Sequence, residues 1–450
     1  MATLVIAADW IVPVESPAIS KGFLVIQDGF IVHVSDRLPD GYENCPLVRL
    51  VGGAIVPGLI NAHCHLELSD IDPCLIAPAN DTGHGSMVGW LNQVMARKKS
   101  IANSGVDIEE IKRKAILSGL EESWKFGTRW IIDNITAPWS ADWCESWQAK
   151  FSGALKSDKL LALAAQSRLF VQPCVELVDV TQSRLTQTVE FAQRTESTLK
   201  GMSLGESANV CHTPMGLAPH APYTASKRLV GYALRCVSSS GGILSMHLAE
   251  SLEELDYADR RQGPFKQWIS PWIDAEHASQ IGSIQEHLQL LCTSPKALIA
   301  HGNYLGDRQI ELLSSHPHQV AVVYCPRTHQ HFRHSEHPAR RIVKGQIPLF
   351  LGTDSKASNP DLSVFKEWQT ACKAFPDLGP KFWMAACTTG PAKFLGVEKL
   401  VGTLRVGSKS LLTWVPLERQ TPETEEQLWE SLLEANRAMP LECHPVFADS

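Results

Sequence analysis

The sequence lacks the features that mark several common classes of protein. None of its twelve cysteines belongs to a Cys-x-x-Cys pair, which argues against a thiolate zinc site or a redox motif. No uninterrupted apolar run approaches the roughly 18–20 residues that a membrane span requires. Residues 1–14 are mostly apolar but carry Asp9 and have no basic start, so they make a poor signal peptide. We therefore expect a cytoplasmic protein.

An excess of positive charge is also missing. The net charge is −7 at pH 7, so nothing in the composition predicts binding to nucleic acid or to an anionic membrane. Hydrophobic residues make up 44% of the chain and charged residues 20%, which is ordinary for a globular protein. A length of 450 residues suits a large barrel together with a smaller module.

Short β-prone segments lie near both ends of the chain. The predicted strands there are Thr3–Ala7, Phe23–Gln27, Phe30–Ser35, Leu47–Val51 and Leu411–Val415. Asp28-Gly29, between two of them, is a hairpin turn signal. We predict a small β-sandwich module built from residues 1–56 and 397–450. A terminal helix is predicted over 421–437, with Thr421 as its cap and Pro422 at its first position. Two unrelated β appendages are the alternative.

Between these ends, strand-like and helix-like segments alternate about eight times. The predicted strands include Arg129–Asn134, Leu169–Leu177, Met215–His220, Ile243–His247, Ala297–His301, Val320–Cys325 and Pro348–Asp354. The predicted helices include Ile108–Trp124, Leu185–Thr198, Ala225–Ser239, Asp307–Ser315 and Phe365–Ala374. This alternation predicts an α/β fold, a parallel (β/α)8 TIM barrel over residues 57–396. In such barrels the chemistry lies on loops at the C-terminal ends of the strands.

Histidines and an aspartate stand at several of these strand ends. His63 and His65 close an apolar run, and alternation in a strand directs both side chains to one side, close enough to hold one ion. His247, His301 and Asp354 also follow short apolar runs. A histidine pair by itself can fill an ordinary core position. A buried polar group at a strand mouth costs stability unless it is paired or bound, however, so the set as a whole favours a metal site.

Five motifs coincide with these strand ends. They are Pro57–His65, Ala218–Thr224, His247–Glu250, Ala300–Gly302 and Leu351–Asp354. With them the chain resembles the amidohydrolase superfamily over nearly its whole length. The similarity is to the branch of aromatic-amine deaminases and triazine chlorohydrolases, which includes adenosine-derivative, guanine and aminofutalosine deaminases.

The resemblance implies a particular ligand set. It assigns His63, His65, His247 and Asp354 to one divalent metal ion, with zinc expected and iron(II) as the other usual choice. Binuclear members of the superfamily bridge two ions with a carbamylated lysine at the end of the fourth strand. The segment 216–222 of this chain contains no lysine, which favours a single ion.

A hydrolytic mechanism follows from these parts. A divalent ion lowers the pKa of bound water from ~15.7 towards ~7, and the resulting metal-bound hydroxide would attack a ring carbon. Asp354 would both ligate the ion and accept the proton of that water. Glu250 would deliver a proton to a neighbouring ring nitrogen, although pairing with a helix start is a plainer role for it. His301 would orient the hydroxide and stabilise charge on its oxygen.

Substrate contacts are predicted at four further residues. His220 resembles a family position that touches substrate, and Glu176 is either a hydrogen-bonding residue or part of an ion pair at the barrel mouth. The branch commonly shows Cys-Pro-x-Ser-Asn after the seventh strand, whereas residues 325–331 here include Arg327 and His329. Arg327 suits a carboxylate or phosphate on the substrate. A solvated surface loop is the alternative for this segment.

The sequence therefore predicts a metal-dependent hydrolase that removes the amine from a heteroaromatic substrate such as an adenosine derivative, another purine or aminofutalosine. Hydrolysis of another C–N bond or of a C–Cl bond on such a ring is the alternative, because either leaving group needs the same attack. A non-catalytic barrel used for binding is the third possibility. We expect a small heteroaromatic molecule as the partner, no nucleic acid or membrane, and a homodimer.

Overall fold

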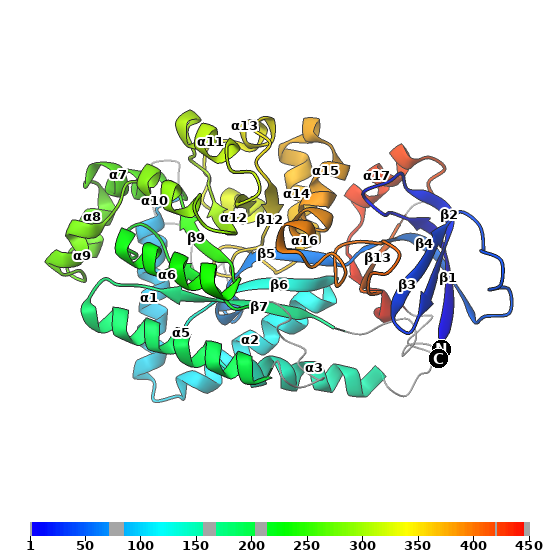
Figure 1. Cartoon of the computed structure of the whole chain (residues 1–450), viewed down its shortest axis with the longest axis horizontal. Coiled ribbons are helices and arrows are strands. Elements are labelled where there is room, and N and C mark those ends of the chain that lie inside the picture. The colour runs from blue at the N-terminus through cyan, green and yellow to red at the C-terminus, as the bar shows by residue number, and fades with distance from the viewer. Residues whose placement is uncertain (1, 72–84, 156–167, 203–213, 419–420, 445–450) are drawn as a thin grey trace.

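The computed structural model describes residues 2–71, 85–155, 168–202, 214–418 and 421–444. Figure 1 shows two parts along the long axis, a barrel surrounded by helices and a smaller sheet that contains the N-terminal strands. Strands from both ends of the chain form the smaller sheet. The predicted fold class, a TIM barrel with a β module built from both termini, is confirmed. The domain boundaries placed after residues 56 and 396 stay a prediction.

Eight parallel strands form the barrel, each paired with the next along the chain. They are β5 (Leu59–Cys64), β6 (Thr128–Ile135), β7 (Phe170–Leu177), β8 (Gly216–Pro219), β9 (Leu244–Leu248), β10 (Ala297–His301), β11 (Val320–Tyr324) and β12 (Leu349–Leu351). Nearly all their residues are buried, as expected for strands covered on both faces. Each predicted barrel strand overlaps one of these. The largest difference is at the last one, because β12 ends three residues before Asp354.

The barrel closes between its first and last strands, beside the candidate site. Cys64 and Asp354 form a parallel bridge. The backbone N–H groups of Thr353 and Asp354 donate to the carbonyl of His63 over 3.1 and 3.0 Å. A Cβ atom on Gly352 would lie 2.9 Å from the backbone of His63, so only glycine allows this approach. The closure therefore fixes His63 and Asp354 next to each other.

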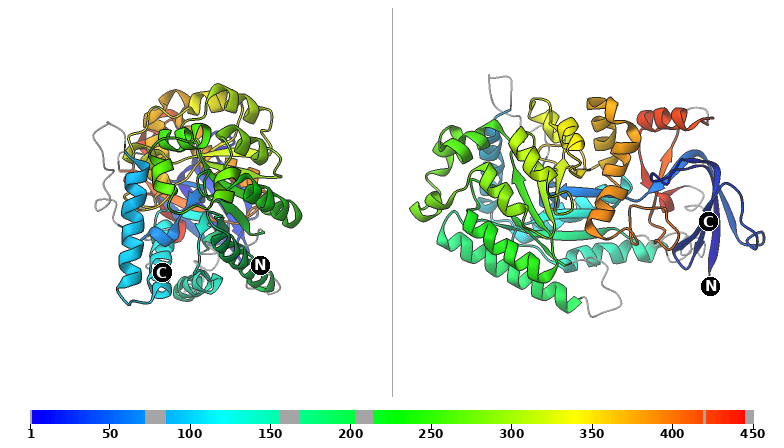
Figure 2. Two further views of the ribbon diagram at one scale, coloured as in Figure 1. Left: turned by 90° about the vertical axis from the view of Figure 1, so that its left-hand side faces the viewer. Right: turned by 45° about the horizontal axis from the view of Figure 1, so that its top comes forward.

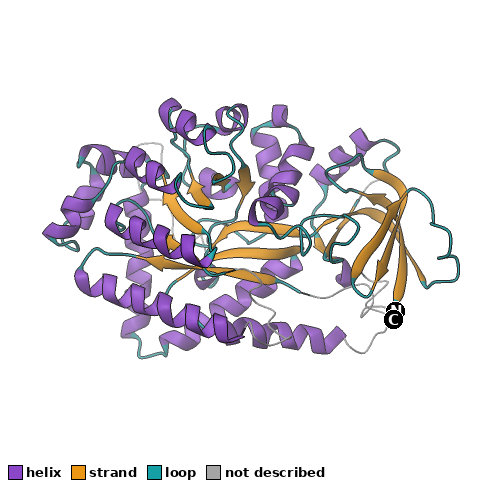
Figure 3. Ribbon diagram, in the orientation of Figure 1, coloured by secondary structure: helices purple, strands orange, loops and turns teal. Residues whose placement is uncertain are grey.

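Helices cover the outside of the barrel (Figure 3). They are α1 (Met87–Asn103), α2 (Ile108–Lys125), α3 (Ala141–Leu155), α5 (Gln182–Met202), α6 (Lys227–Ser240), α7 (Leu252–Arg260), α8 (Pro264–Ile269), α9 (Ala275–Gln280), α10 (Ile284–Leu291), α11 (Asp307–Ser314), α12 (Pro326–His331), α13 (Ala339–Lys344), α14 (Val364–Ala374), α15 (Pro380–Ala386) and α16 (Thr389–Leu395). The five predicted helices each overlap one of them. The group α7 to α9 lies at the end of the molecule opposite the smaller sheet (Figures 1 and 2). Among the helices that the structure describes, none is both long enough and apolar enough to span a membrane.

The smaller sheet has six strands in the order β14-β13-β4-β1-β2-β3. They are β1 (Thr3–Ile11), β2 (Ile19–Gln27), β3 (Phe30–Ser35), β4 (Leu47–Pro57), β13 (Leu412–Pro416) and β14 (Met439–Pro440). The predicted hairpin joins β2 to β3, where Asp28 and Gly29 have φ of 49° and 81°. Positive φ at both turn residues is the type I′ pattern. Among the described residues, the strands of the predicted β-sandwich module form a single hydrogen-bonded sheet. Because β4 leads directly into β5, the barrel strands start beside this sheet and their C-terminal ends point away from it.

The terminal helix α17 (Glu425–Glu434) begins later than predicted. Thr424, not Thr421, is its cap, and its hydroxyl accepts a hydrogen bond from the backbone N–H of Gln427 over 3.2 Å. The carbonyl of Pro422 instead accepts a hydrogen bond from the indole of Trp10 over 3.1 Å. This tertiary contact holds the chain outside the helix at the place where local sequence favours its start.

A buried ion pair attaches the end of the chain to the barrel. Arg129 of β6 binds Glu442 in the short helix η4 (Leu441–Cys443), with 2.6 Å between Nη1 and Oε1. The exposed fractions of the two side chains are 1% and 0%. Arg129 also donates to the carbonyl of Leu412 in β13 over 2.8 Å. Buried charges persist only when paired, so this contact holds the C-terminal segment in place.

Candidate metal centre and active site

Three histidines from two strands meet at the mouth of the barrel. His63 and His65 lie at the end of β5, and His247 lies in β9. One ring nitrogen of each lies within 4.8 Å of the others, and the Nε2 atoms of His65 and His247 are 3.1 Å apart. All three side chains are buried. The arrangement agrees with the strand alternation that directs His63 and His65 to one side.

A carboxylate and a fourth histidine complete the cluster. Asp354 Oδ1 lies 3.6 Å from His63 Nε2 and 3.7 Å from His65 Nε2. His301, the last residue of β10, groups with His63 and Asp354 within 4.8 Å. The φ angles of His301 and Asp354 are 69° and 57°, a region that costs energy for residues other than glycine. Strain at two converging strand ends is typical of functional sites.

Hydrogen bonds orient two of these side chains. The Nδ1 atom of His247 lies 2.9 Å from the carbonyl of His220. A carbonyl only accepts, so Nδ1 carries the proton and Nε2 presents its lone pair to the cluster. The hydroxyl of Ser358 donates to Asp354 Oδ2 over 2.7 Å. This bond engages Oδ2 and leaves Oδ1 directed at the histidines.

The donor set of the cluster suits a divalent cation. His63 Nε2 is buried and makes no hydrogen bond to any described residue. Burial lowers the pKa of His65 to about 4 and holds that of His247 well below its usual value, so both rings are neutral, as metal ligands must be. Two imidazole nitrogens that face each other at 3.1 Å need a proton or a cation between them. The structure thus brings together the four side chains expected to bind the metal.

Glu250 faces His301 in the same cavity. Its Oε1 atom lies 3.4 Å from His301 Nε2. Burial raises the pKa of Glu250 well above its usual value and lowers that of His301 to about 3, and both shifts favour the neutral form of the group. The backbone N–H of Glu250 donates to Glu254 Oε2 over 2.7 Å, and Asn303 donates to the carbonyl of Glu250 over 3.0 Å. These bonds hold the turn that presents Glu250.

The plainer role considered for Glu250, pairing with a helix start, belongs to its neighbours. Helix α7 has Ser251 as its N-cap, and the Ser251 hydroxyl accepts from the backbone N–H of Glu254 over 3.1 Å. Glu254 in turn binds the two backbone N–H groups before the helix, those of Ala249 and Glu250. The side chain of Glu250 is therefore left to face the cluster.

Glu176 and His220 lie beside His247. Their ligand-type atoms group with those of His247 within 4.8 Å. Glu176 Oε1 lies 3.7 Å from His65 Nδ1, and His220 Nδ1 lies 2.7 Å from the hydroxyl of Thr224. Burial raises the pKa of Glu176 to about 8 and lowers that of His220 to about 3. Both residues line the cavity, as expected for substrate contacts.

Arg327 and His329 are not among the described residues that line this cavity. The guanidinium of Arg327 forms a two-pronged pair with Asp361, with distances of 2.6 and 3.1 Å. His329 packs its ring against those of Tyr324 and His334, with centroid distances of 5.5 and 5.4 Å. Both side chains are largely shielded from solvent, which does not fit a solvated surface loop, and their role as substrate contacts stays a prediction.

The segment that contains them, α12 and the residues after it, contacts residues of the cluster. His337 Nε2 donates to the carbonyl of His301 over 2.9 Å, and its ring stacks on Tyr324 with 4.1 Å between centroids. The hydroxyl of Thr328 lies 3.0 Å from that of Ser358, which binds Asp354. These buried residues support the strained backbone and the carboxylate of the site. His337 is the last histidine of a histidine-rich run in the sequence, but that pattern does not indicate that His337 supports His301.

The helix α1 forms a wall of the cavity that sequence reasoning missed. The lining residues on α1 are Met87, Trp90, Leu91, Val94 and Lys98. Their spacing places them on one helical face, so the periodicity was present in the sequence. Trp90 Nε1 donates to the carbonyl of Ala357 over 2.9 Å, and the backbone N–H of Val88 donates to Glu253 over 2.9 Å. These long-range bonds hold α1 over the barrel mouth.

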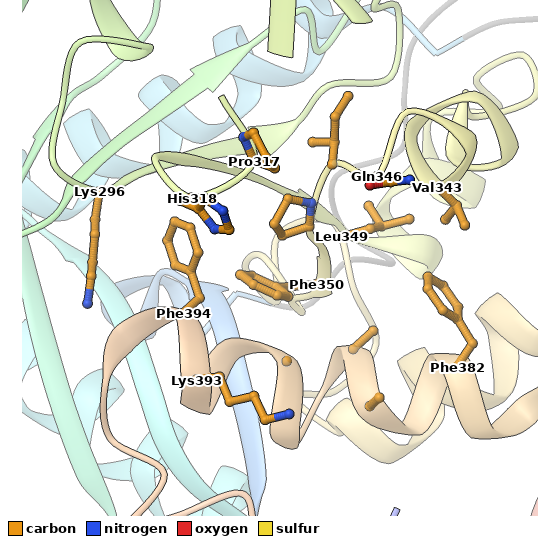
Figure 4. Close-up of a pocket in the computed structure, with 15 residues that line it drawn as sticks. Lys296, Pro317, His318, Val343, Gln346, Leu349, Phe350, Phe382, Lys393 and Phe394 are labelled. Atoms are coloured by element: carbon orange, nitrogen blue, oxygen red, sulfur yellow. The ribbon is translucent and has the colours of Figure 1, made fainter. Parts of the chain in front are cut away.

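A larger cavity lies at the other end of β12 (Figure 4). Its volume is about 660 Å³, compared with about 110 Å³ for the cavity at the cluster. Phe350, Phe382 and Phe394 line it together with Lys296 and Lys393. No carboxylate is among the described residues of this lining. Size therefore does not identify the site, whereas the convergence of acids and imidazoles at the strand ends does.

Comparisons with known proteins identify related sequences and structures. The sequence profile of the amidohydrolase family matches residues 54–432. The 5-methylthioadenosine/S-adenosylhomocysteine deaminase of Carboxydothermus hydrogenoformans is 21% identical over 403 residues, which cover 88% of this chain and 79% of the relative.

Two solved structures share the fold. A zinc-bound adenosine deaminase from Xanthomonas campestris has a TM-score of 0.72 at 20% identity, covering 98% of this chain and 92% of the other. The Helicobacter pylori aminofutalosine deaminase in complex with methylthio-coformycin has a TM-score of 0.71 at 20% identity, covering 96% and 97%. The resemblance stated from the motifs is confirmed.

Proposed function

Since this chain belongs to the amidohydrolase family, we propose that it is a metal-dependent deaminase that hydrolyses the exocyclic amine of an adenosine derivative. One observation carries the proposal. The side chains of His63, His65, His247 and Asp354 converge at the barrel mouth, with the neutral pair Glu250 and His301 beside them. The deaminase names of the relatives support the choice of reaction.

A single divalent ion, with zinc as our choice, would be held by the three imidazoles and the Asp354 carboxylate. When bound, it supplies the Lewis acidity that makes water nucleophilic near neutral pH. The Asp354 carboxylate lies beside the position for that water and accepts its proton.

Glu250 supplies the proton that the ring needs. Attack on the amine-bearing carbon places electrons on the adjacent ring nitrogen, and the neutral carboxyl of Glu250 donates a proton there. Asp354 then passes the proton that it accepted to the amine, which departs as ammonia when the C–N bond breaks. The hydroxyl left on the ring carbon gives its proton to Glu250 and becomes the carbonyl of the product, which restores both carboxyl groups to their starting forms. His301, 3.4 Å from Glu250, holds the attacking oxygen in line through a hydrogen bond.

Glu176 and His220 would recognise the ring edge. Both face the cavity next to His247 and offer hydrogen bonds to ring nitrogens. The thioether or sugar part of the substrate would then contact the apolar side chains of α1, such as Trp90 and Leu91. This division places polar groups at the reacting end and apolar surface along the remainder.

The direct test is a substrate panel with the purified, metal-analysed protein. Adenosine, 5′-deoxyadenosine, 5′-methylthioadenosine, S-adenosylhomocysteine and guanine would be followed by ammonia release and ultraviolet change. We expect ammonia from at least one adenosine derivative and none from the Asp354→Asn variant. Asp307→Asn, an exposed control on α11, keeps full activity. Absence of turnover across the panel, with metal present, contradicts the proposal, and chloride release from a chlorotriazine would assign the other leaving group.

A further inference from the structure

The cavity at the cluster is too small for the substrate of the proposed reaction. Its volume is about 110 Å³, whereas pockets that hold small-molecule ligands usually measure about 300–1,000 Å³. The strands β5 to β12 are held by their hydrogen-bonded ladder and cannot supply the missing space. Helix α1 contributes Met87, Trp90, Leu91, Val94 and Lys98 to the lining. An outward movement of α1 would therefore open the cavity.

Helix α1 is packed loosely enough for such a movement. Of its seventeen residues only Met87 and Val94 are buried, whereas α2, with eighteen residues, buries six. An element with few buried contacts opens at a low cost in free energy. At its C-terminal end α1 joins α2 through a turn that contains Gly105, whose φ is 72° and whose added Cβ atom would meet no described atom within 4 Å. A glycine in open space can absorb the change in backbone angles that a hinge requires.

The N-terminal end of α1 is attached to Glu253, a residue of α7. The hydroxyl of Ser86, the N-cap of α1, donates to Glu253 Oε1 over 2.8 Å, and the backbone N–H of Val88 donates to Oε2 over 2.9 Å. A carboxylate at a helix N-terminus makes charge-assisted bonds, which are about twice as strong as neutral ones such as that from Trp90 to the carbonyl of Ala357. Among the described residues, Glu253 therefore provides the strongest polar attachment of this end.

The helix that carries Glu253 also presents Glu250. Glu254 binds the backbone N–H of Glu250 over 2.7 Å, while its neighbour Glu253 binds α1. We propose that α1 is a lid over the barrel mouth, that it turns about Gly105, and that Glu253 latches it shut. That the cavity receives a substrate rests on the proposed function, whereas the latch does not. Closure excludes water from the reacting groups and leaves α1 and Glu250 held by the same end of α7.

The latch is tested by the reactivity of a thiol placed under the lid. Val94 lines the cavity and is 6% exposed, so the thiol of Val94→Cys is reached by iodoacetamide only when α1 opens. The metal-loaded protein is alkylated without ligand, and peptide masses separate this thiol from the native ones. We expect alkylation about tenfold faster when Glu253→Ala is added, and an intermediate rate with Glu253→Gln, which keeps one acceptor but loses the charge. Asp256→Asn is the matched control on α7, because that carboxylate pairs with Arg260 at the surface, and it keeps the starting rate.

The lid is tested by the rates at which a ligand enters and leaves. Methylthio-coformycin, which is bound in the structure of the Helicobacter pylori relative, is the probe, and stopped-flow fluorescence follows it. Both association and dissociation are expected to be faster in Glu253→Ala than in the wild type, because both steps need α1 to be open. Bound probe is expected to slow the alkylation of Val94→Cys.

The outcomes separate the latch, the lid and the proposed reaction. Equal alkylation with and without Glu253→Ala overturns the latch. Faster alkylation with unchanged association and dissociation rates overturns the lid. Faster alkylation in a protein that neither binds the probe nor releases ammonia from the substrate panel keeps the latch and discards the deaminase. If Glu253→Ala lowers the temperature of thermal unfolding, the same comparisons are made with Glu253→Gln, which preserves the shape of the side chain.

Discussion

Replacing Glu250 with glutamine isolates the proton that the proposed reaction needs. Burial raises the pKa of Glu250 well above its usual value, which favours a neutral carboxyl there. Glutamine is neutral and of the same shape, and the bonds that hold this turn come from the backbone N–H and carbonyl of Glu250. The substitution therefore removes a transferable proton while leaving charge, packing and turn geometry in place.

The size of the effect follows from this role. General acid–base catalysis by a positioned side chain contributes about 10²–10⁴-fold to the rate. Each tenfold corresponds to about 1.4 kcal/mol, so the barrier rises by about 3–5 kcal/mol. Because glutamine still offers hydrogen bonds to the ring, the loss appears in kcat, and KM changes by less than about threefold.

Steady-state kinetics on the best adenosine derivative measures this loss, together with metal content and thermal unfolding. Asp256→Asn on the same segment is the matched control, because that carboxylate pairs with Arg260 at the surface. It is expected to keep wild-type kinetics. If Glu250→Gln retains kcat within a factor of about five at full metal content, Glu250 is not the proton donor.

Three further predictions concern residues around the cluster and in the core. His337→Phe keeps the ring that stacks on Tyr324 but removes the hydrogen-bond donor to the carbonyl of His301. We expect kcat to fall about tenfold at constant KM, and His337→Gln to recover part of the loss. An unchanged kcat in His337→Phe would show that His337 does not support His301. Glu442→Ala leaves Arg129 buried without its partner and lowers the unfolding free energy by about 3–5 kcal/mol in urea titrations. The double change Arg129→Met with Glu442→Leu restores most of that free energy. A loss below about 1 kcal/mol in Glu442→Ala contradicts the stabilising role of the buried pair. Burial raises the pKa of Glu367 from 4.5 to about 8, so its contribution to stability is complete below about pH 4.5 and is lost as the pH rises to about 8, by at most about 1.4 kcal/mol per pH unit. Glu367→Gln flattens that slope in unfolding titrations between pH 5 and 8, and parallel profiles of the two proteins would refute the assignment.

The residues of the metal cluster were predictable from local sequence. His63 and His65 could be paired because alternation in a strand is a local property of the backbone. His247, His301 and Asp354 stood out because a polar side chain at the end of a buried apolar strand is costly unless it is paired or binds a ligand. In a parallel barrel the order of the strands follows from their order along the chain, so the proximity of these residues at one end of the barrel could be predicted as well.

Side-chain partners across the fold were not predictable in the same way. Arg327 suggested an anion-binding residue, but Asp361, 34 positions further along, occupies its guanidinium. Helix α17 begins at Glu425 with Thr424 as its cap, and the carbonyl of Pro422, which was expected inside the helix, accepts a hydrogen bond from Trp10. Periodicity shows that α1 has an apolar face but not what that face covers.

The sequence by itself determined where the strands end and which of those ends carry the histidines and the aspartate that we propose to bind metal, since both depend on neighbours within a few residues. The tertiary structure alone decided that α1 closes over the cluster, that Lys98 reaches the cavity, and that burial raises the pKa of Glu250. Those properties arise from contacts between distant segments and from the exclusion of water, and no local pattern encodes either of them.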